Sequence, residues 1–133
     1  MEQVIQLLNE AQYGFLATVD NGKPRVRPWG FMFAEEGKLY FCTSSQKDVY
    51  RQLVALPDIE YAATSKNMVT VRITGAVEFC EDRAKKEKAL NASDLVKRIY
   101  QTADNPIFKV FAIAHGTAVI SDFSGNPPRT VEF

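Results

Sequence analysis

Hydroxyl residues, a lysine and a helix start come together in one short segment of the chain, "TSSQKDVYRQL". Ser45, with Asp48 three residues later, fits a capping box, in which side chains satisfy the first free amides of a helix. A cap requires neither Thr43 and Ser44 nor Lys47 in the first turn, where the helix dipole disfavours positive charge. Amides, hydroxyls and a lysine at a helix start also suit a phosphate. The segment is therefore compatible with a plain helix cap and with a phosphate site.

A second cluster, "PRVRPWGF", precedes this segment and has the alternation of a strand. The residues that share one strand face are Arg25, Arg27, Trp29 and Phe31. An outward face with two solvated arginines is one interpretation of this pattern. Pro28 cannot donate a ladder hydrogen bond and Gly30 has no side chain, so the strand lies at an edge or a bulge with free backbone. A flat ring along this strand, with a phosphate tail at Lys47, would use both clusters.

The overall composition predicts one globular domain spanning residues 1–133, because 46% of the residues are hydrophobic. The 16 Lys and Arg residues balance the 16 Asp and Glu residues, which gives a formal net charge of +0. No global basic field therefore attracts the chain to nucleic acid or to an anionic membrane, and any anion site must be local.

The cysteines and the amino-terminal segment indicate a reducing, cytoplasmic location. Cys42 and Cys80 form no CxxC pair and His115 is the one histidine, so neither a zinc site nor a disulfide framework is expected. We interpret both cysteines as buried thiols. The start "MEQVIQLLNE" lacks a basic region and a long apolar run, and no other stretch is long enough to span a bilayer.

Turn signals and hydrophobic periodicity divide the chain into elements that position these clusters. We expect helices over residues 1–12 and 45–56, and a helical stretch over 81–102 that breaks near Asn91–Ser93 with Ser93 as a cap. We expect strands over 13–19, 24–33, 39–44, 57–64, 67–80 and 107–123, and a tail over 124–133. The first three strands should form a meander. Gly75 should bend its strand, and His115–Gly116 should interrupt the last one.

About six strands with a few helices predict a mainly β fold, an antiparallel barrel with helices outside it. The stretch "FLATVDNGKPRVRPWGFMFAEEGKLYFCTSSQKDVYRQL" followed by "VRITGAVEF" resembles the split-barrel flavoproteins of the pyridoxamine 5′-phosphate oxidase-like superfamily. The resemblance covers about Tyr13 to Phe79, and the order of the features carries it rather than one strict motif. It implies a split barrel, FMN as cofactor, and a homodimer with flavin sites at the subunit interface.

The resemblance also assigns roles to residues of this chain. The strand matching Arg27, Pro28, Trp29 and Gly30 lines the flavin ring and supplies an arginine towards the phosphate. The segment matching Cys42, Thr43 and Ser44 contacts the cofactor's tail, Lys47 binds the phosphate, and the strand from Thr70 to Arg72 approaches the ribityl chain or pyrimidine edge. Many members carry a second basic residue beside the lysine, where this chain has Gln46. Phosphate binding should therefore depend more on Arg27 or Arg25.

Resemblance to the superfamily does not imply the activity of its best-known enzyme. Pyridoxamine phosphate oxidases carry carboxy-terminal Trp and Arg residues, whereas Trp29 is the single tryptophan here and the sequence ends at Phe133. We expect instead an FMN-dependent oxidoreductase, such as a nitro-group or flavin reductase, that takes electrons from a small donor such as a reduced nicotinamide. The alternative is a non-catalytic flavin, deazaflavin or haem binding protein. No catalytic acid, base or metal ligand is evident.

A homodimer is expected on two further grounds. The edge strand with Pro28 leaves a flat surface, and four phenylalanines offer more aromatic area than one small core requires. These are Phe31, Phe33, Phe108 and Phe111. The alternative is that all four fill the barrel. Candidates for completing the partner's pocket are the stretches Asn105–Phe111 and Leu95–Tyr100.

Overall fold

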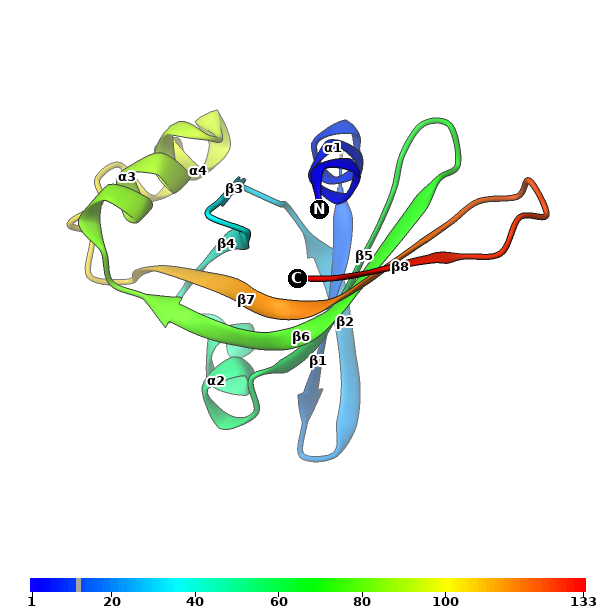
Figure 1. Ribbon diagram of the computed structural model, residues 1–133. Helices are drawn as coiled ribbons and strands as arrows, with labels where there is room; N and C mark the ends of the chain where they lie inside the picture. The colour runs from blue at the N-terminus through cyan, green and yellow to red at the C-terminus, as the bar shows by residue number, and fades with distance from the viewer. Residues whose placement is uncertain (12) are drawn as a thin grey trace.

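The elements of the chain follow one another as shown in Figure 1, in which the computed structural model describes residues 1–11 and 13–133. The helices are α1 (Glu2–Glu10), α2 (Asp48–Ala55), α3 (Arg83–Asn91) and α4 (Asp94–Tyr100). The strands are β1 (Gly14–Asp20), β2 (Lys23–Trp29), β3 (Phe33–Glu35), β4 (Lys38–Ser44), β5 (Asp58–Thr64), β6 (Thr70–Cys80), β7 (Phe108–Ser121) and β8 (Arg129–Glu132). None of these described helices is long and apolar enough to cross a membrane.

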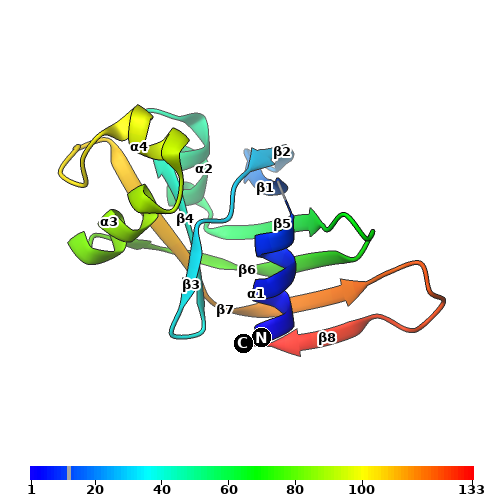
Figure 2. The same cartoon turned by 90° about the horizontal axis from the view of Figure 1, so that it is seen from above.

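In the described part of the chain, eight strands form one antiparallel sheet in the order β2-β1-β5-β6-β7-β4-β3, with β8 paired to β7. The first half of β7 pairs with β4 and its second half with β8, while β6 follows its other edge. The sheet curves around the larger hydrophobic core. Helices α3 and α4 lie together to one side of the sheet (Figures 1 and 2). The predicted mainly β, antiparallel split barrel with helices outside is confirmed.

The predicted three-stranded meander is wrong, because the strand expected over residues 24–33 is two strands. β2 pairs with β1 at one edge of the sheet, whereas β3 pairs with β4 at the other edge. Pro28 still pairs with Phe15, β2 ends one residue later at Trp29, and the chain rejoins the sheet at Phe33. The edge position expected from Pro28 is confirmed, since β2 has a neighbour on one side only.

Two further differences concern the last strands. The predicted tail contains β8, and β7 is not interrupted at His115–Gly116. The pairing of β6 with β7 instead shifts register between Gly75 and Val77, which confirms a bend at Gly75. A Cβ on Gly75 would lie 2.9 Å from the His115 carbonyl oxygen, so only glycine allows the two backbones to approach at this bulge.

β4 is buried on both faces because it lies between two hydrophobic cores. Leu39 and Phe41 point into the larger core, which α1 and α2 close with Val4, Leu7, Leu8, Val49 and Leu53. Tyr40 and Cys42 point into a smaller core under α3 and α4. The continuous apolar run of this strand thus reflects its burial on both faces, up to its end at Ser44.

The helical boundaries near the carboxy-terminal half agree with the sequence. The break between α3 and α4 falls at Ala92 and Ser93, and the Ser93 hydroxyl accepts a hydrogen bond from the Val96 amide, so the predicted cap is confirmed. The predicted first helix corresponds to α1, although Gln12 at its expected end lies outside the described residues.

The inference of surplus aromatic residues is wrong. Phe33, Phe108 and Phe111 are buried in the chain's own cores, and Phe31 packs against the larger one. The exposed apolar surface lies elsewhere, on other side chains. The exposed large hydrophobic residues on or beside the β1–β2 hairpin are Tyr13, Phe15 and Val26, at 63%, 52% and 69% exposure.

We predict that Gly14→Ala destabilises the fold by about 1–3 kcal/mol, the usual effect of overpacking a core. A Cβ on Gly14 would overlap the ring of the buried Tyr61, whose hydroxyl donates a 3.0 Å hydrogen bond to the Trp29 carbonyl. Urea unfolding measures the change. Gly30→Ala is the control, because its Cβ meets only the flexible end of Met32. Equal losses for the two variants would contradict this packing.

Candidate cofactor-binding pocket

A pocket of about 270 Å³ lies where the ends of β2 and β4 meet the start of α2 and the side of α4. The structure brings together six of the site residues expected from the sequence: Pro28, Trp29, Gly30, Cys42, Thr43 and Lys47. Six other residues complete its lining, and all six are apolar or aromatic and uncharged: Tyr13, Met32, Leu95, Val96, Ile99 and Tyr100. The pocket therefore has an apolar wall and a polar end.

Trp29 and Lys47 are held against each other at the polar end. The Trp29 indole N–H donates a 3.1 Å hydrogen bond to the Cys42 carbonyl, which fixes the ring against β4. The Lys47 ammonium lies 5.1 Å from the centre of this ring, a cation–π contact. The lysine is thus placed over an aromatic face, and no carboxylate of the described residues is within ion-pair distance of it.

The start of α2 differs from the predicted capping box. The helix begins at Asp48, its N-cap residue is Lys47 in an extended conformation, and no side chain caps it. Ser45 is therefore not the cap, and Lys47 is not in the first turn. A tight turn delays the helix: the Lys47 amide donates to the Ser44 carbonyl and the Gln46 amide donates to the Ser44 hydroxyl. The expected conflict between Lys47 and the helix dipole is correspondingly smaller.

Thr43 lines the pocket and has a buried side-chain oxygen without a hydrogen-bond partner in the described part of the chain. Its side chain is 1% exposed, and its hydroxyl oxygen has no hydrogen-bond partner among the described residues. Leaving a buried hydroxyl unpaired costs about 1–3 kcal/mol, so such groups generally meet a ligand, an ion or a water. The position of this hydroxyl in the pocket wall with Lys47 favours an anionic ligand.

The neighbouring Cys42 is a packed thiol and not a nucleophile. Burial raises its pKa to about 12, and the nearby Lys47 charge opposes this shift only in part. The thiol is therefore protonated at neutral pH, when the reactive form of cysteine is the thiolate. Cys42 fits the predicted buried thiol, whereas Cys80 is half-buried.

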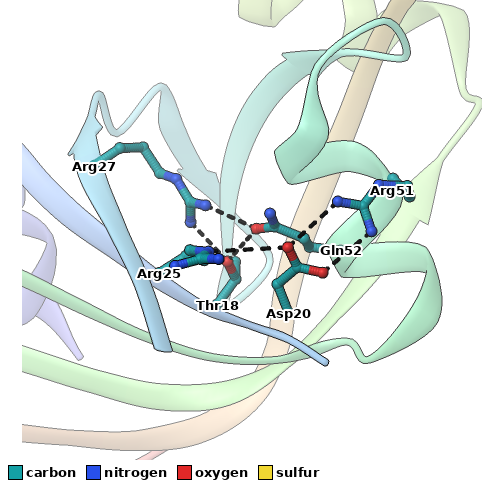
Figure 3. A network of polar contacts seen from close by, with 6 residues as sticks. All are labelled: Thr18, Asp20, Arg25, Arg27, Arg51 and Gln52. Atoms are coloured by element: carbon teal, nitrogen blue, oxygen red, sulfur yellow. Dashed lines mark hydrogen bonds and ion pairs between the residues drawn. The ribbon is translucent and has the colours of Figure 1, made fainter. Parts of the chain in front are cut away.

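Neither arginine of the second cluster lines the pocket, and only Arg27 is partly buried. Arg27 contacts β1 and α2, and Arg25 forms a 3.9 Å ion pair with Asp20 (Figure 3). The interpretation of this face as outward and solvated is wrong for Arg27, which is half-buried. Arg27 and Trp29 share a strand face by the period of two, so the guanidinium is directed to the same side of β2 as the pocket's indole.

Thr70 and Arg72 lie apart from the pocket. Arg72 pairs with Glu60 at 2.7 Å, and the Thr70 and Thr64 hydroxyls are 2.9 Å apart. Arg72 faces outward, in register through Ala62 with Phe15. Ser44 is also outside the lining, since its hydroxyl is used in the turn before α2.

Helix α4 was assigned by the sequence to a partner's pocket, yet it lines the pocket of its own chain. Leu95 and Ile99, each 59% exposed, recur at helical spacing on this helix. That spacing was the available signal for a ligand-facing side. Thr18 and Gln52 were also missed, because a single threonine in a strand and a glutamine in a helix give no pattern in the sequence.

Comparison with known proteins shows the family and the fold of the chain. The family described as pyridoxamine 5′-phosphate oxidase matches residues 1–121. The chain belongs to this family. It is 33% identical to a NimC/NimA family protein from Clostridium acetobutylicum, with a TM-score of 0.92 over 100% of this chain and 92% of the other.

Two less similar structures show the same fold. General Stress Protein 26 from Bacillus anthracis is 22% identical, with a TM-score of 0.82 over 99% of this chain and 97% of the other. A heme binding protein from Mycobacterium smegmatis is 18% identical, with a TM-score of 0.83 over 98% of this chain and 57% of the other. The chain matches no curated protein.

Proposed function

We propose that the chain binds FMN, with the phosphate at Thr43 and Lys47 and the ring along the segment from Pro28 to Gly30. The observation that carries the proposal is the buried, unpartnered Thr43 hydroxyl in the same pocket wall as Lys47. Phosphate oxygens accept hydrogen bonds from hydroxyls and ammonium groups, and charged hydrogen bonds of this kind are the stronger ones.

The lining fits the remainder of the cofactor. Met32, Val96 and Ile99 give the apolar wall that a flat ring system requires, and Gly30 leaves the backbone accessible beside it. Half-buried Arg27 adds a positive charge on the same side of β2. The charged end and the apolar wall thus match the two ends of FMN, whereas a ligand without an anionic group would leave Lys47 and Thr43 unused.

The associated activity that we propose is that of an oxidoreductase, in which FMN would supply hydride or electron transfer from a donor such as a reduced nicotinamide. The chain's own residues bind and orient the cofactor. Cys42 stays protonated and the exposed His115 does not line the pocket, so neither is assigned a catalytic role. A cytoplasmic location remains part of the proposal and is compatible with two free cysteines.

The competing function is a carrier of flavin, deazaflavin or haem without turnover. One solved structure of similar fold is a heme binding protein, so haem is the cofactor to titrate against FMN. We expect FMN to bind more tightly than haem, and the FMN-loaded protein to oxidise a reduced nicotinamide with electrons passing to oxygen or an added dye. Tight FMN binding without this oxidation would favour the carrier, and preferential binding of haem would contradict the FMN assignment.

We also propose that the working unit is a homodimer formed across the outer face of β2, β1, β5 and β6. Pro28, Phe15, Ala62 and Arg72 are successive register partners on these strands and therefore share that face. Exposed Val26 extends it, and Tyr13 connects it to the pocket. Exposed apolar patches of this kind mark interaction sites.

The pocket's size supports the same proposal. Its volume of about 270 Å³ in one chain is below the roughly 300–1,000 Å³ of most ligand pockets, so one chain covers only part of FMN. A second chain packed on the outer face would bring its own Thr70 and Arg72 to a flavin that they do not reach within their own chain.

Lys47→Ala should weaken FMN binding by about 1.5–3 kcal/mol, roughly ten- to a hundredfold, through loss of one charged hydrogen bond. Riboflavin, which lacks the phosphate, should lose little. Titration by flavin fluorescence measures both affinities, with Lys66→Ala, in an exposed turn, as the matched control. If Lys47→Ala lowered the two affinities equally, the phosphate would not lie at Lys47.

Val26→Glu should convert the dimer to a monomer and lower FMN affinity, because a charge would be buried in the interface and half of each pocket would be lost. Val26 is exposed in the single chain, so the fold should tolerate the change. Sedimentation and FMN titration measure the two effects. Phe123→Glu, at a similarly exposed position in the loop before β8, is the control. A wild-type monomer that binds FMN tightly would contradict the shared site.

A further inference from the structure

Three arginines, Arg25, Arg27 and Arg51, gather between the β1–β2 hairpin and α2, and one carboxylate pairs with two of them (Figure 3). Asp20 pairs with Arg51 through two contacts of 3.2 and 3.4 Å and with Arg25 at 3.9 Å. The hydrogen bond from Arg51 lowers the pKa of Asp20, so the carboxylate is charged at neutral pH. Arg25 and Arg51 are therefore compensated within the chain.

Arg27 differs from its two neighbours because all its partners are neutral. One terminal nitrogen, Nη1, donates to the Thr18 hydroxyl at 2.8 Å and to the Leu16 carbonyl at 3.3 Å. The other, Nη2, donates to the Gln52 side-chain oxygen at 2.8 Å. Among the described residues no carboxylate lies within ion-pair distance of Arg27.

The neutral partners form a closed and buried arrangement. The Thr18 hydroxyl donates a 2.6 Å hydrogen bond to the Gln52 oxygen, so Thr18, Gln52 and Arg27 bond to one another in a triangle. Thr18 and Gln52 are only 2% and 4% exposed. Both side chains have a fixed orientation as a result, and they hold the guanidinium in one place between β2 and α2 (Figure 3).

The charge of Arg27 remains without compensation in this setting. Burial, followed by repulsion from Arg25, lowers the pKa of Arg27, yet guanidinium groups stay protonated in proteins. A glutamate in place of Gln52 would neutralise it with almost no change of shape. A half-buried cation that lacks a counterion is unfavourable in the isolated chain, and an incoming anion removes this penalty.

We propose that Gln52 and Thr18 are positioning residues that hold Arg27 charged and uncompensated for the cofactor's phosphate, and thereby select FMN over riboflavin. The inference rests on the proposed function. Gln52 lies on α2, whose N-cap is Lys47, and Arg27 lies two residues before Trp29 on β2. The triangle thus joins the two elements that carry the lysine and the indole of the pocket.

The test is Gln52→Glu, which keeps the shape and gives Arg27 a carboxylate partner. We expect FMN affinity to fall at least tenfold, riboflavin affinity to change less than about twofold, and the thermal midpoint to stay equal or rise. Ala55→Glu adds the same charge to the exposed end of α2 and is the matched control. A purely structural role of Gln52 would move both flavin affinities together and would overturn the proposal.

A double-mutant cycle shows whether Gln52 acts through Arg27. In an Arg27→Gln background, Gln52→Glu should no longer lower FMN affinity, because the carboxylate then has no guanidinium to neutralise. If Gln52→Glu does not fold, two variants of Thr18 test the same positioning role. Thr18→Val should lower the affinity for FMN but not for riboflavin, and Thr18→Ser should lower neither. Retention of FMN selectivity in Thr18→Val or in folded Gln52→Glu would overturn the proposal.

The wild-type protein separates this inference from the proposed function. A wild type that binds FMN and riboflavin equally would overturn both. A wild type that prefers FMN, loses the preference in Lys47→Ala and keeps it in Gln52→Glu would overturn the positioning role alone.

Discussion

The hydrogen bond from the Trp29 indole to the Cys42 carbonyl joins two strands that the sheet keeps apart. β2 is the edge strand at one end of the strand order, and β4 lies next to the other end, so no ladder hydrogen bond connects them. The Trp29 indole bridges the two strands. The Tyr61 hydroxyl also donates a hydrogen bond to the Trp29 backbone carbonyl. The pocket depends on this hydrogen bond, because Trp29 lines the pocket and contacts Lys47 at its polar end.

The positive charge near the pocket has no carboxylate partner among the described residues. Asp20 neutralises the outer arginines, whereas Lys47 rests on an aromatic ring and Arg27 on neutral acceptors. With an overall formal net charge of +0, the chain concentrates uncompensated positive charge locally and not across its surface. This arrangement suits one small anionic group much better than an extended polyanion.

The sequence predicted the fold class well because turn signals and alternation are local properties. The bend at Gly75 and the Ser93 cap were both evident from neighbouring residues. The separation of β2 from β3 was not, because it depends on β4 pairing with β7, more than sixty residues later in the chain. Gln52 of α2 shows the same limit: its role comes from contacts to β1 and β2, which no spacing in the sequence reveals.

The central claim is that the cofactor's phosphate lies at Thr43 and Lys47. A crystal structure of the chain with FMN tests it most directly. We expect the phosphate within hydrogen-bonding distance of the Thr43 hydroxyl and the Lys47 ammonium, on the side of β2 that carries Arg27. A phosphate placed elsewhere, with the Thr43 hydroxyl still unpartnered, would contradict the account.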